Sequence, residues 1–515
     1  MASNPDIVIA GSGMAGICAA IAAAECGVRG RRHTPENMYK YLRQELGLAD
    51  GDAATPAVDD ATLKNFCDES VARNEWLEQH GAVFASQLCP FKVMYPPGKY
   101  GLYFSGNEKA HPFASVAAPA PRGHRTAGKG MTGNVLWEAL FASVLKLGVV
   151  FQAASRVQEI LVTAEGGGGV KGVRYKSLET TSEGYAKYKK LAQCELKYRK
   201  LMMEAVANWY NSRAEKVWLA EAKEKTITTK AVVLAAGGYV MNKEMVEKYA
   251  PFAKHFIPVA TVGDDGSGIQ LGQSVGGALT HMDRLVVGRF LSPPTAFMEG
   301  AAVSPGGERI AAEDLHGMAF GEAMRTKHDG NGFLVLDAVQ WRKSKQQLGE
   351  QAQWPMNLPV KCLLYWPWVH KKAKNLASLS FKIGVPEVAL RKTVGSYNAA
   401  IAEGKPDPAN KLEYRSAIER APFYAIDISF RRTGLQFVTG FTIGGLKVDG
   451  GSGIVLNGNG EGIAGVYAAG RNAAGICSQS VVSGLSLADG VFSGKRAGGH
   501  AARAVLGAKG AKGAV

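Results

Sequence analysis

Apolar residues in this chain gather in short runs that end in glycine. Residues 6–10 form one such run, which leads into the glycine-rich turn 11–16 and then into an alanine-rich stretch that ends at Glu25. This order predicts a strand, a turn and a helix that begins at Ile17. "AVVLAAGG" (231–238) and "GVYAAGR" (465–471) repeat the strand-to-glycine pattern. The three runs predict an α/β domain built from N-terminal, middle and C-terminal segments around one cleft.

The regions between these runs have helical spacing. "HTPENMYKYLRQEL" (33–46) begins with a Thr cap and a Pro at the first helical position, which predicts a helix start. "DDATLKNFCDESVARNEWLEQHG" (59–81) predicts a single amphipathic helix closed by Gly81. Residues 180–224 are polar and rich in Lys and Tyr. We interpret them as an inserted helical segment, either a solvated helix pair or a lid or oligomer contact.

These patterns divide the chain into parts. Residues 1–250, with the helical insertion 180–224, form the first part of a Rossmann-like domain, and residues 435–500 form its last part. Residues 251–434 mix strands and helices and predict an inserted α+β domain. Residues 501–515 are low in complexity and basic, which predicts a flexible tail.

Composition and charge limit the class of protein and the kind of partner. The chain has 515 residues, 46% of them hydrophobic and 20% charged, as in ordinary globular proteins. The formal charge of +15 is compatible with an anionic partner surface or with a basic solvated face. Lys and Arg are dispersed and no nucleic-acid motif is present, so we favour the second and expect no nucleic-acid partner.

Cysteine usage and hydropathy point to a compartment. The seven cysteines are scattered, odd in number and without a Cys-x-x-Cys pair, which argues against a disulfide framework or a zinc site. No apolar run reaches membrane-spanning length, and the N-terminus lacks the charge pattern of a signal peptide. The sequence therefore predicts a cytoplasmic protein without a transmembrane segment or a bound metal.

The turn at residues 11–16 carries the first chemical signal. Gly11, Gly13 and Gly16 match G-x-G-x-x-G between a strand and a helix, where glycines let backbone N–H groups approach a pyrophosphate. A tight packing turn is the alternative. The acidic residue expected about 20 positions later falls in "RGRRHTPENM" (29–38), which is not an apolar strand. Glu36 has a plausible spacing, but it lies at a helix start, where it would face the helix dipole.

Several motifs resemble a known family. "IVIAGSGMAG", "VVLAAGGYVMNKEMV", "GDDGSGIQLG", "FTIGGLKVD" and "GVYAAGRNAAG" resemble flavoproteins of the fumarate reductase, succinate dehydrogenase and 3-ketosteroid dehydrogenase family. "YFSGNEKAHPF", "APAPRGH" and "RIAAEDLHG" resemble the steroid branch, and within it the 3-ketosteroid 4-ene (5α) group. The resemblance implies FAD bound in an extended pose, a capping substrate domain over the flavin, and hydride transfer to flavin N5.

The resemblance also implies which residues bind FAD. They are Gly11, Ser12, Gly13, Met14, Ala15 and Gly16 at the pyrophosphate; Ala236, Gly237 and Gly238 beside the adenosine half; Asp265, Gly266 and Gly268 in a helix-opening loop; and Gly470, Arg471, Leu485, Ser486 and Leu487 along the ribityl chain and the flavin.

The chain departs from the family pattern at three places. The second strand, which normally ends in the ribose-binding Glu, is missing between positions 28 and 33, so we expect weakened FAD affinity. His316 and Val481 stand where the steroid branch has Tyr, whereas Ser483 is kept. We expect His316 and Ser483 to carry the proton chemistry and the backbone at Gly445 and Gly484 to bind a keto oxygen. The alternative for His316 is a structural helix-start histidine.

Three functions follow from these features. The favoured one is an FAD-dependent CH–CH oxidoreductase acting on a flat apolar ketone, most specifically a 3-ketosteroid. A reductase of unsaturated dicarboxylates is less favoured, because "SPPT" (292–295) lacks a His and "CSQSVVSG" (477–484) lacks an Arg. The third is a degenerate, non-catalytic relative. The sequence does not specify the electron acceptor or the oligomeric state.

Overall fold

A computed structural model describes residues 5–25, 34–48, 56–163, 169–201, 203–353, 357–432, 435 and 437–512. Its central sheet has the order β1 (Ile7–Ala10), β7 (Ala231–Leu234), β18 (Gly462–Ala468) and β17 (Ile454–Leu456). The first three strands are parallel and β17 is antiparallel. These three parallel strands are the three glycine-ended runs, so the predicted α/β domain of sequence-distant segments is confirmed.

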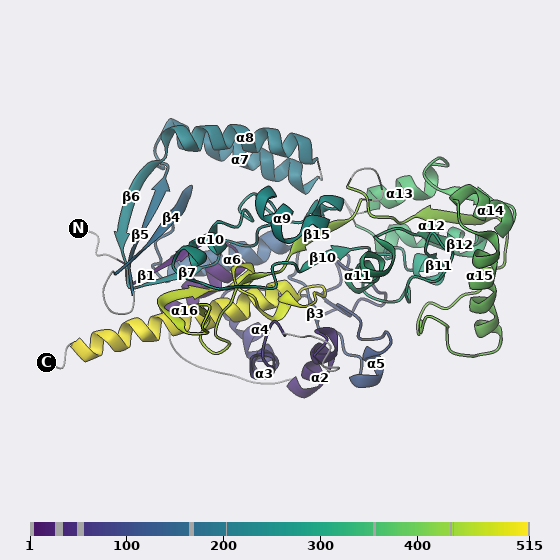
Figure 1. Cartoon of the computed structure of the whole chain (residues 1–515), viewed down its shortest axis with the longest axis horizontal. Helices are drawn as coiled ribbons and strands as arrows, with labels where there is room; N and C mark the ends of the chain where they lie inside the picture. Colours follow the sequence, from purple (N-terminus) through teal and green to yellow (C-terminus); the bar gives the residue numbers. More distant parts are fainter. Residues whose placement is uncertain are drawn as a thin grey trace.

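Two helices pack closely beside this sheet. They are α1 (Met14–Glu25), which begins three residues before the predicted start, and α16 (Leu485–Lys512). A Cβ at Gly498 would lie 2.1 Å from the carbonyl oxygen of Ala19, so only glycine allows this approach. Helix α16 continues to the end of the described chain, so residues 501–512, predicted to be a flexible tail, are helical. In Figure 1 it projects toward the C-terminus.

The insertion is a helical hairpin. Strands β4 (Ser155–Val162), β5 (Val170–Ser177) and β6 (Lys223–Thr228) form an antiparallel sheet. Helices α7 (Glu183–Lys200) and α8 (Glu204–Glu221) rise from it and pack against each other along the top of Figure 1. The predicted helix pair is therefore present, and an ion pair between Glu204 and Arg432 ties its tip to the segment that leaves the inserted part.

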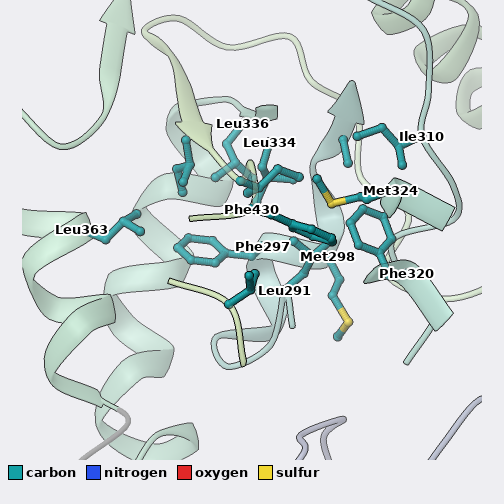
Figure 2. Close-up of a cluster of buried hydrophobic side chains, with 14 of the residues drawn as sticks. Leu291, Phe297, Met298, Ile310, Phe320, Met324, Leu334, Leu336, Leu363 and Phe430 are labelled. Carbon is teal, nitrogen blue, oxygen red and sulfur yellow. The ribbon is translucent and has the colours of Figure 1, made fainter. Parts of the chain in front are cut away.

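The inserted part has its own sheet. Its order is β11 (Ala301–Val303), β12 (Phe333–Leu336), β14 (Phe423–Asp427) and β13 (Lys371–Ala373), all antiparallel. Five helices accompany it. α11 (Gly317–His328) lies toward the middle of the molecule in Figure 1, whereas the sheet lies nearer one end with α12 (Ala338–Gln351), α13 (Asn357–Tyr365), α14 (Leu376–Ile383) and α15 (Glu387–Ala402). Figure 2 shows the core of this part, in which Leu291, Phe297 and Met298 pack near Phe430.

Short strands join the two parts. β10 (Leu285–Gly288) pairs with β15 (Thr439–Thr442), which also pairs with β8 (Ile257–Pro258), and β9 (Leu279–Thr280) pairs with β16 (Gly445–Leu446). α9 (Lys243–Tyr249) precedes β8, and α10 (Ser267–Ser274) follows it. α10 contacts β4 and β7 of the first part of the Rossmann-like domain and β16 of its last part. The boundaries at 251 and 434 remain predictions.

The N-terminal third supplies several further small elements. They are α2 (Pro35–Glu45), α3 (Asp60–Asp68), α4 (Ser70–Gln79), β2 (Leu102–Tyr103), α5 (Phe113–Val116), β3 (Gly123–His124) and α6 (Gly133–Lys146). The single helix predicted over 59–81 is thus two helices. Residue Glu69 separates them: it is the C-cap residue of α3 and the N-cap residue of α4.

The missing second strand bears on β1. The positions where the sequence lacks it, 28–33, lie outside the described residues. Within the described ranges, β1 pairs only with β7 and so lies at the edge of its sheet. No helix in the described part of the chain combines the length and apolar character needed to cross a bilayer.

Candidate active site

The turn after β1 has the shape that a diphosphate requires. At Gly11 the φ angle is +127°, and a Cβ would lie 2.2 Å from the carbonyl oxygen of Ala235. Gly13 faces open space, with no atom within 4 Å of a Cβ placed there. Helix α1 begins at the next residue, Met14. Its unpaired N–H groups therefore lie beside an open turn, which is a typical anion-binding arrangement.

Side chains that the sequence analysis did not select hold the other glycine loops. Asn472 accepts from the N–H of Ala236 and donates Nδ2 to the Gly237 carbonyl at 2.9 Å. Asp264 accepts from the N–H of Gly238 at 2.7 Å. The ends of β7 and β18 are thereby tied together. Asp264 and Asn472 directly adjoin Asp265 and Arg471, which the sequence analysis selected. This adjacency is the signal that could have identified them.

Arg471 joins these loops. Its Nη2 donates to Asp264 at 2.8 Å, whereas its Nη1 is buried and has no hydrogen-bond partner. A Cβ at Gly238 would lie 3.4 Å from that Nη1, and a Cβ at Gly470 would lie 2.9 Å from the Cβ of Ala15. The structure thus brings these predicted cofactor residues from three segments together, with an orphaned guanidinium nitrogen among them.

The loop 265–268 and the start of α16 complete this set. Asp265 accepts from the N–H of Ser267 at the start of α10, where Gly266 is the N-cap residue, and a Cβ at Gly268 would lie 2.5 Å from Asn472. Gly484 has a φ of +82° and would have no atom within 4 Å of an added Cβ, and it directly precedes α16. Ser486 lies in the first turn of α16, Leu485 packs into the core, and Leu487 is exposed.

A pocket lies where the inserted part meets this domain. Its walls come from three segments: Lys92, Val93, Met94, Phe104; Phe290, Leu291, Ser292, Met298; and Leu315, His316, Gly317. The lining is mostly apolar. Its cavity volume is about 20 Å³, room for about one water molecule. A ring-sized ligand would therefore require side chains to move.

Ser483 lies beside this pocket. Its N–H donates to the Ser105 carbonyl at 3.0 Å and its hydroxyl donates to the Met94 carbonyl at 2.8 Å. Since the Ser483 hydroxyl proton is already donated to Met94, the Tyr103 hydroxyl, 2.9 Å away, donates to Ser483 Oγ. Burial raises the pKa of Tyr103 to about 12, so Tyr103 is a neutral phenol. The sequence analysis noted the motif "YFSGNEK" but predicted no role for Tyr103.

His316 is the pocket residue with an unused polar atom. It is 5% exposed and caps α11, accepting the Met318 N–H through Nδ1 at 3.4 Å. Its Nε2 is buried without a partner. Burial and the nearby Lys92 lower its pKa to about 3, so the ring is neutral. With Nδ1 used as an acceptor, the single ring proton belongs on Nε2, and His316 offers a hydrogen-bond donor.

The motif around His316 is rigidly held. Glu313 is fully buried and pairs with Arg309 at 2.6 Å and with Lys411 at 3.0 Å. Asp314 accepts from two backbone N–H groups of the 412–413 loop, and the His316 N–H donates to Asn107 Oδ1 at 2.6 Å. These contacts hold the backbone that carries His316, although the residues lie far apart in sequence.

Lys92 is the one lysine in the pocket wall. Its ammonium group donates to the Asp314 carbonyl, and burial lowers its pKa. Sequence reasoning missed it, because a lone lysine in a loop carries no motif.

The remaining predicted residues lie elsewhere. Gly445 is in β16, where a Cβ would lie 2.7 Å from the Asn472 carbonyl oxygen, and it does not line the pocket. Val481 is buried in the core formed with α2 and α3. Glu36 is exposed and pairs with Lys40 at 2.9 Å. Nothing in the described residues connects Glu36 with the cofactor loops.

The open diphosphate turn, the joined glycine loops and the pocket at the domain junction define an FAD-dependent oxidoreductase. Comparison with known proteins agrees. A model of the FAD binding domain family matches residues 29–480. The chain is 30% identical to 3-oxo-5-alpha-steroid 4-dehydrogenase from Comamonas testosteroni, over 90% of this chain and 92% of that protein.

Two further similarities are to a steroid dehydrogenase structure and to a fumarate reductase. The crystal structure of 3-ketosteroid-delta4-(5alpha)-dehydrogenase from Rhodococcus jostii RHA1, in complex with 4-androstene-3,17-dione, superposes with a TM-score of 0.75 at 27% identity, covering 96% of both chains. A probable fumarate reductase from Shewanella frigidimarina is 26% identical over 54% of this chain and 45% of its own length. The chain belongs to this family of FAD-binding flavoproteins, and FAD is its cofactor.

The residues present fit FAD. The turn 11–16 and the N-terminus of α1 suit the diphosphate, and the orphaned Nη1 of Arg471 is a donor without a protein acceptor. No cluster of three or more His, Cys, Asp or Glu side chains that could hold a metal ion occurs among the described residues.

Proposed function

We propose that this flavoprotein dehydrogenates a flat apolar ketone, specifically a saturated 3-ketosteroid, next to its carbonyl group. The observation that carries the proposal is the pocket between the two parts of the chain. It is mostly apolar, and it combines one neutral imidazole donor, at His316, with a hydroxyl pair, Tyr103 and Ser483, at its border. A ketone needs one donor for its oxygen and one proton route.

We assign the ketone oxygen to His316. The sequence suggested that His316 handles a proton, but a ring whose pKa is about 3 is a weak base. A neutral Nε2–H is instead suited to polarise a carbonyl, because it stabilises the negative charge that develops on an enolate oxygen. Lys92 lies in the same pocket wall and adds a second source of positive potential. The backbone N–H groups at Gly484 and Gly445 remain candidates from the sequence alone.

We assign the departing proton to Ser483 and Tyr103. A hydroxyl pair moves a proton by accepting it at one oxygen while the other oxygen releases its own proton. The released proton must pass to water, because the Met94 carbonyl that accepts the Ser483 hydrogen bond cannot take up a proton. A phenol with a pKa of about 12 acts in this way as a relay rather than as a resident base. Val481 has no hydroxyl to contribute.

The overall reaction is a desaturation. One carbon next to the carbonyl loses the proton, its neighbour loses a hydride, and a carbon–carbon double bond forms between them. FAD supplies the chemistry of accepting that hydride, and an electron acceptor of unspecified identity must then reoxidise it. The protein residues orient the ketone, keep the pocket dry and carry the proton.

An anaerobic mixing experiment tests the proposal. The purified protein should be yellow, and a saturated 3-keto-5α-steroid should bleach its visible flavin absorbance, whereas succinate should not. Bleaching by the dicarboxylate but not by the steroid would favour the fumarate-reductase-like alternative. A yellow protein that no ketosteroid reduces would support the degenerate, non-catalytic alternative.

A further inference from the structure

Exposed aromatic side chains lie at the C-terminal end of helix α13 and directly after it, in the inserted part. Tyr365, Trp366, Pro367 and Trp368 are four consecutive exposed residues. The Trp366 and Trp368 side chains are 43% and 72% exposed, and their rings stack with centroids 5.8 Å apart. Tryptophan is normally among the more buried residue types, so a stacked pair that is exposed to solvent indicates a binding surface.

The chain segment that carries these aromatic residues has basic but no acidic side chains. From Glu350 to Glu387 the chain contains five lysines, at positions 361, 371, 372, 374 and 382, and no acidic residue between the two glutamates. Lys371 and Lys372 lie on β13, the edge strand of the sheet, and are exposed, as is Lys374. Lys382 Nζ donates to the Lys372 carbonyl at 2.7 Å, so α14 brings a further cation to this edge.

The aromatic turn is firmly supported from beneath. Leu363 and Leu364 of α13 are buried in the same core as Leu291 and Met298, which also line the pocket (Leu363 is on the Phe297 side of the core in Figure 2). His370 follows the turn and hydrogen-bonds the Leu363 carbonyl at 3.0 Å. Neither tryptophan belongs to this core, and both rings lie at the surface.

We infer that Tyr365, Trp366, Trp368, Lys371, Lys372 and Lys374, here termed the Trp–Lys surface, dock this protein on an anionic lipid bilayer. Tyr and Trp rings favour the headgroup level, and lysines beside them are attracted to anionic lipids. An acidic protein surface would attract the lysines, but it would not explain why the stacked tryptophan rings are exposed to solvent. In Figure 1, α13 lies along the upper side of the inserted part and α14 at its far end, both away from the central sheet. The overall charge of +15 acts in the same direction.

Vesicle sedimentation tests this inference with the full-length FAD-loaded protein. Binding should be strong to vesicles of phosphatidylcholine and phosphatidylglycerol in equal parts, weak to phosphatidylcholine alone, and reduced by salt. Each surface lysine contributes about fivefold to partitioning, so changing three should weaken binding roughly a hundredfold. The variants are Lys371→Gln, Lys372→Gln and Lys374→Gln combined, and Trp366→Ser with Trp368→Ser.

The helical hairpin offers a matched control. Trp209 on α8 is 50% exposed, and α7 carries five exposed lysines, among them Lys187, Lys189 and Lys190. Trp209→Ser, and Lys187→Gln, Lys189→Gln and Lys190→Gln combined, should leave binding nearly unchanged. Brominated lipids should quench tryptophan emission in the wild type and less in the Trp366→Ser, Trp368→Ser variant.

The outcomes separate the possible partners. Equal loss of vesicle binding in the hairpin variants, or none in the Trp–Lys variants, would overturn the inference. A concentration-dependent dimer that the paired tryptophan change abolishes, without vesicle binding, would assign the surface to a second copy and also overturn it. Unchanged flavin absorbance and melting temperature in every variant keep these results independent of folding and of the proposed reaction.

Discussion

Three substitutions at His316 separate its possible roles, because each keeps a different part of the imidazole. Asn places an acceptor oxygen near the position of Nδ1, so it preserves the cap of α11 and removes the Nε2 donor. Gln places an amide N–H near the position of Nε2 and gives up the cap. Phe fills the volume and keeps neither. The comparison therefore isolates the donor from the cap and from the packing of the ring.

The structure sets the expected size of the effect. Nε2 is buried, unpartnered and on a neutral ring, so a bond from it to an enolate oxygen would form in a water-poor pocket. Loss of one such donor typically costs about 10²- to 10³-fold in rate, about 2.7–4 kcal/mol. Asn and Phe should show this loss, whereas Gln should stay within about tenfold of the wild type and lose about 0.5–2 kcal/mol of stability with the cap.

The assay is the rate of flavin bleaching by a saturated 3-ketosteroid in anaerobic stopped-flow, with flavin content and melting temperature measured for each variant. Equal inactivity of the Asn, Gln and Phe proteins would show that His316 must gain or lose a proton, since none of the three titrates. Full activity of the Asn protein, with loss in the Gln protein, would show that only the helix cap matters. Either result would refute the donor assignment.

Further predictions follow from the same geometry. The folded-state pKa of His316 lies below its ordinary 6.5, at about 3, so its stabilising effect is present above pH 6.5 and is lost as the pH falls. Denaturant unfolding should show about 2 kcal/mol lost between pH 6.5 and pH 5 relative to His316→Asn, at about 1.36 kcal/mol per pH unit. An equal pH dependence in both proteins would contradict this. Ser483→Ala should slow flavin bleaching about 10²- to 10⁴-fold, and Tyr103→Phe should also slow it, with the steroid KM little changed. Normal rates in both variants would contradict the proposed proton relay. Gly498→Val should destabilise the chain and release FAD, measured by flavin fluorescence, because the close approach of α16 to Ala19 is lost.

The fold was predictable where a local rule determined the structure. The three glycine-ended strands adjoin the cofactor cleft because each chain segment needs glycine at the same kind of close approach, as at Gly11 against Ala235. Glycine at such a place is visible in the sequence without knowing its neighbour. The end of α16 was missed for a related reason: its small residues suggested a frayed tail, yet "RAVLGAKGAK" continues the helix to Lys512.

The pocket was predictable only in part. His316 and Ser483 stood in family motifs, but their partners lie far away in sequence: Asn107 is 209 positions from His316, and Tyr103 is 380 from Ser483. A side chain's tautomer or hydroxyl direction depends on such partners, so the chemical role of His316 could not follow from its position. The exposure of Trp366 is a similar case, since an aromatic run at the end of a helix is usually core.

The two halves of the proposed chemistry come from different parts of the chain. His316 belongs to the inserted part, and Ser483 belongs to the loop before α16. The segment 92–107 touches both, because Asn107 accepts from the His316 N–H while Met94 and Ser105 hold Ser483. A movement of the inserted part relative to the central sheet would therefore separate the oxygen donor from the proton route, and neither half could complete the reaction alone. Since the pocket has room for about one water molecule, admission of the proposed ketosteroid requires its walls to move; if the inserted part moves with them, closing again would rebuild both halves around the ligand and exclude water from the enolate.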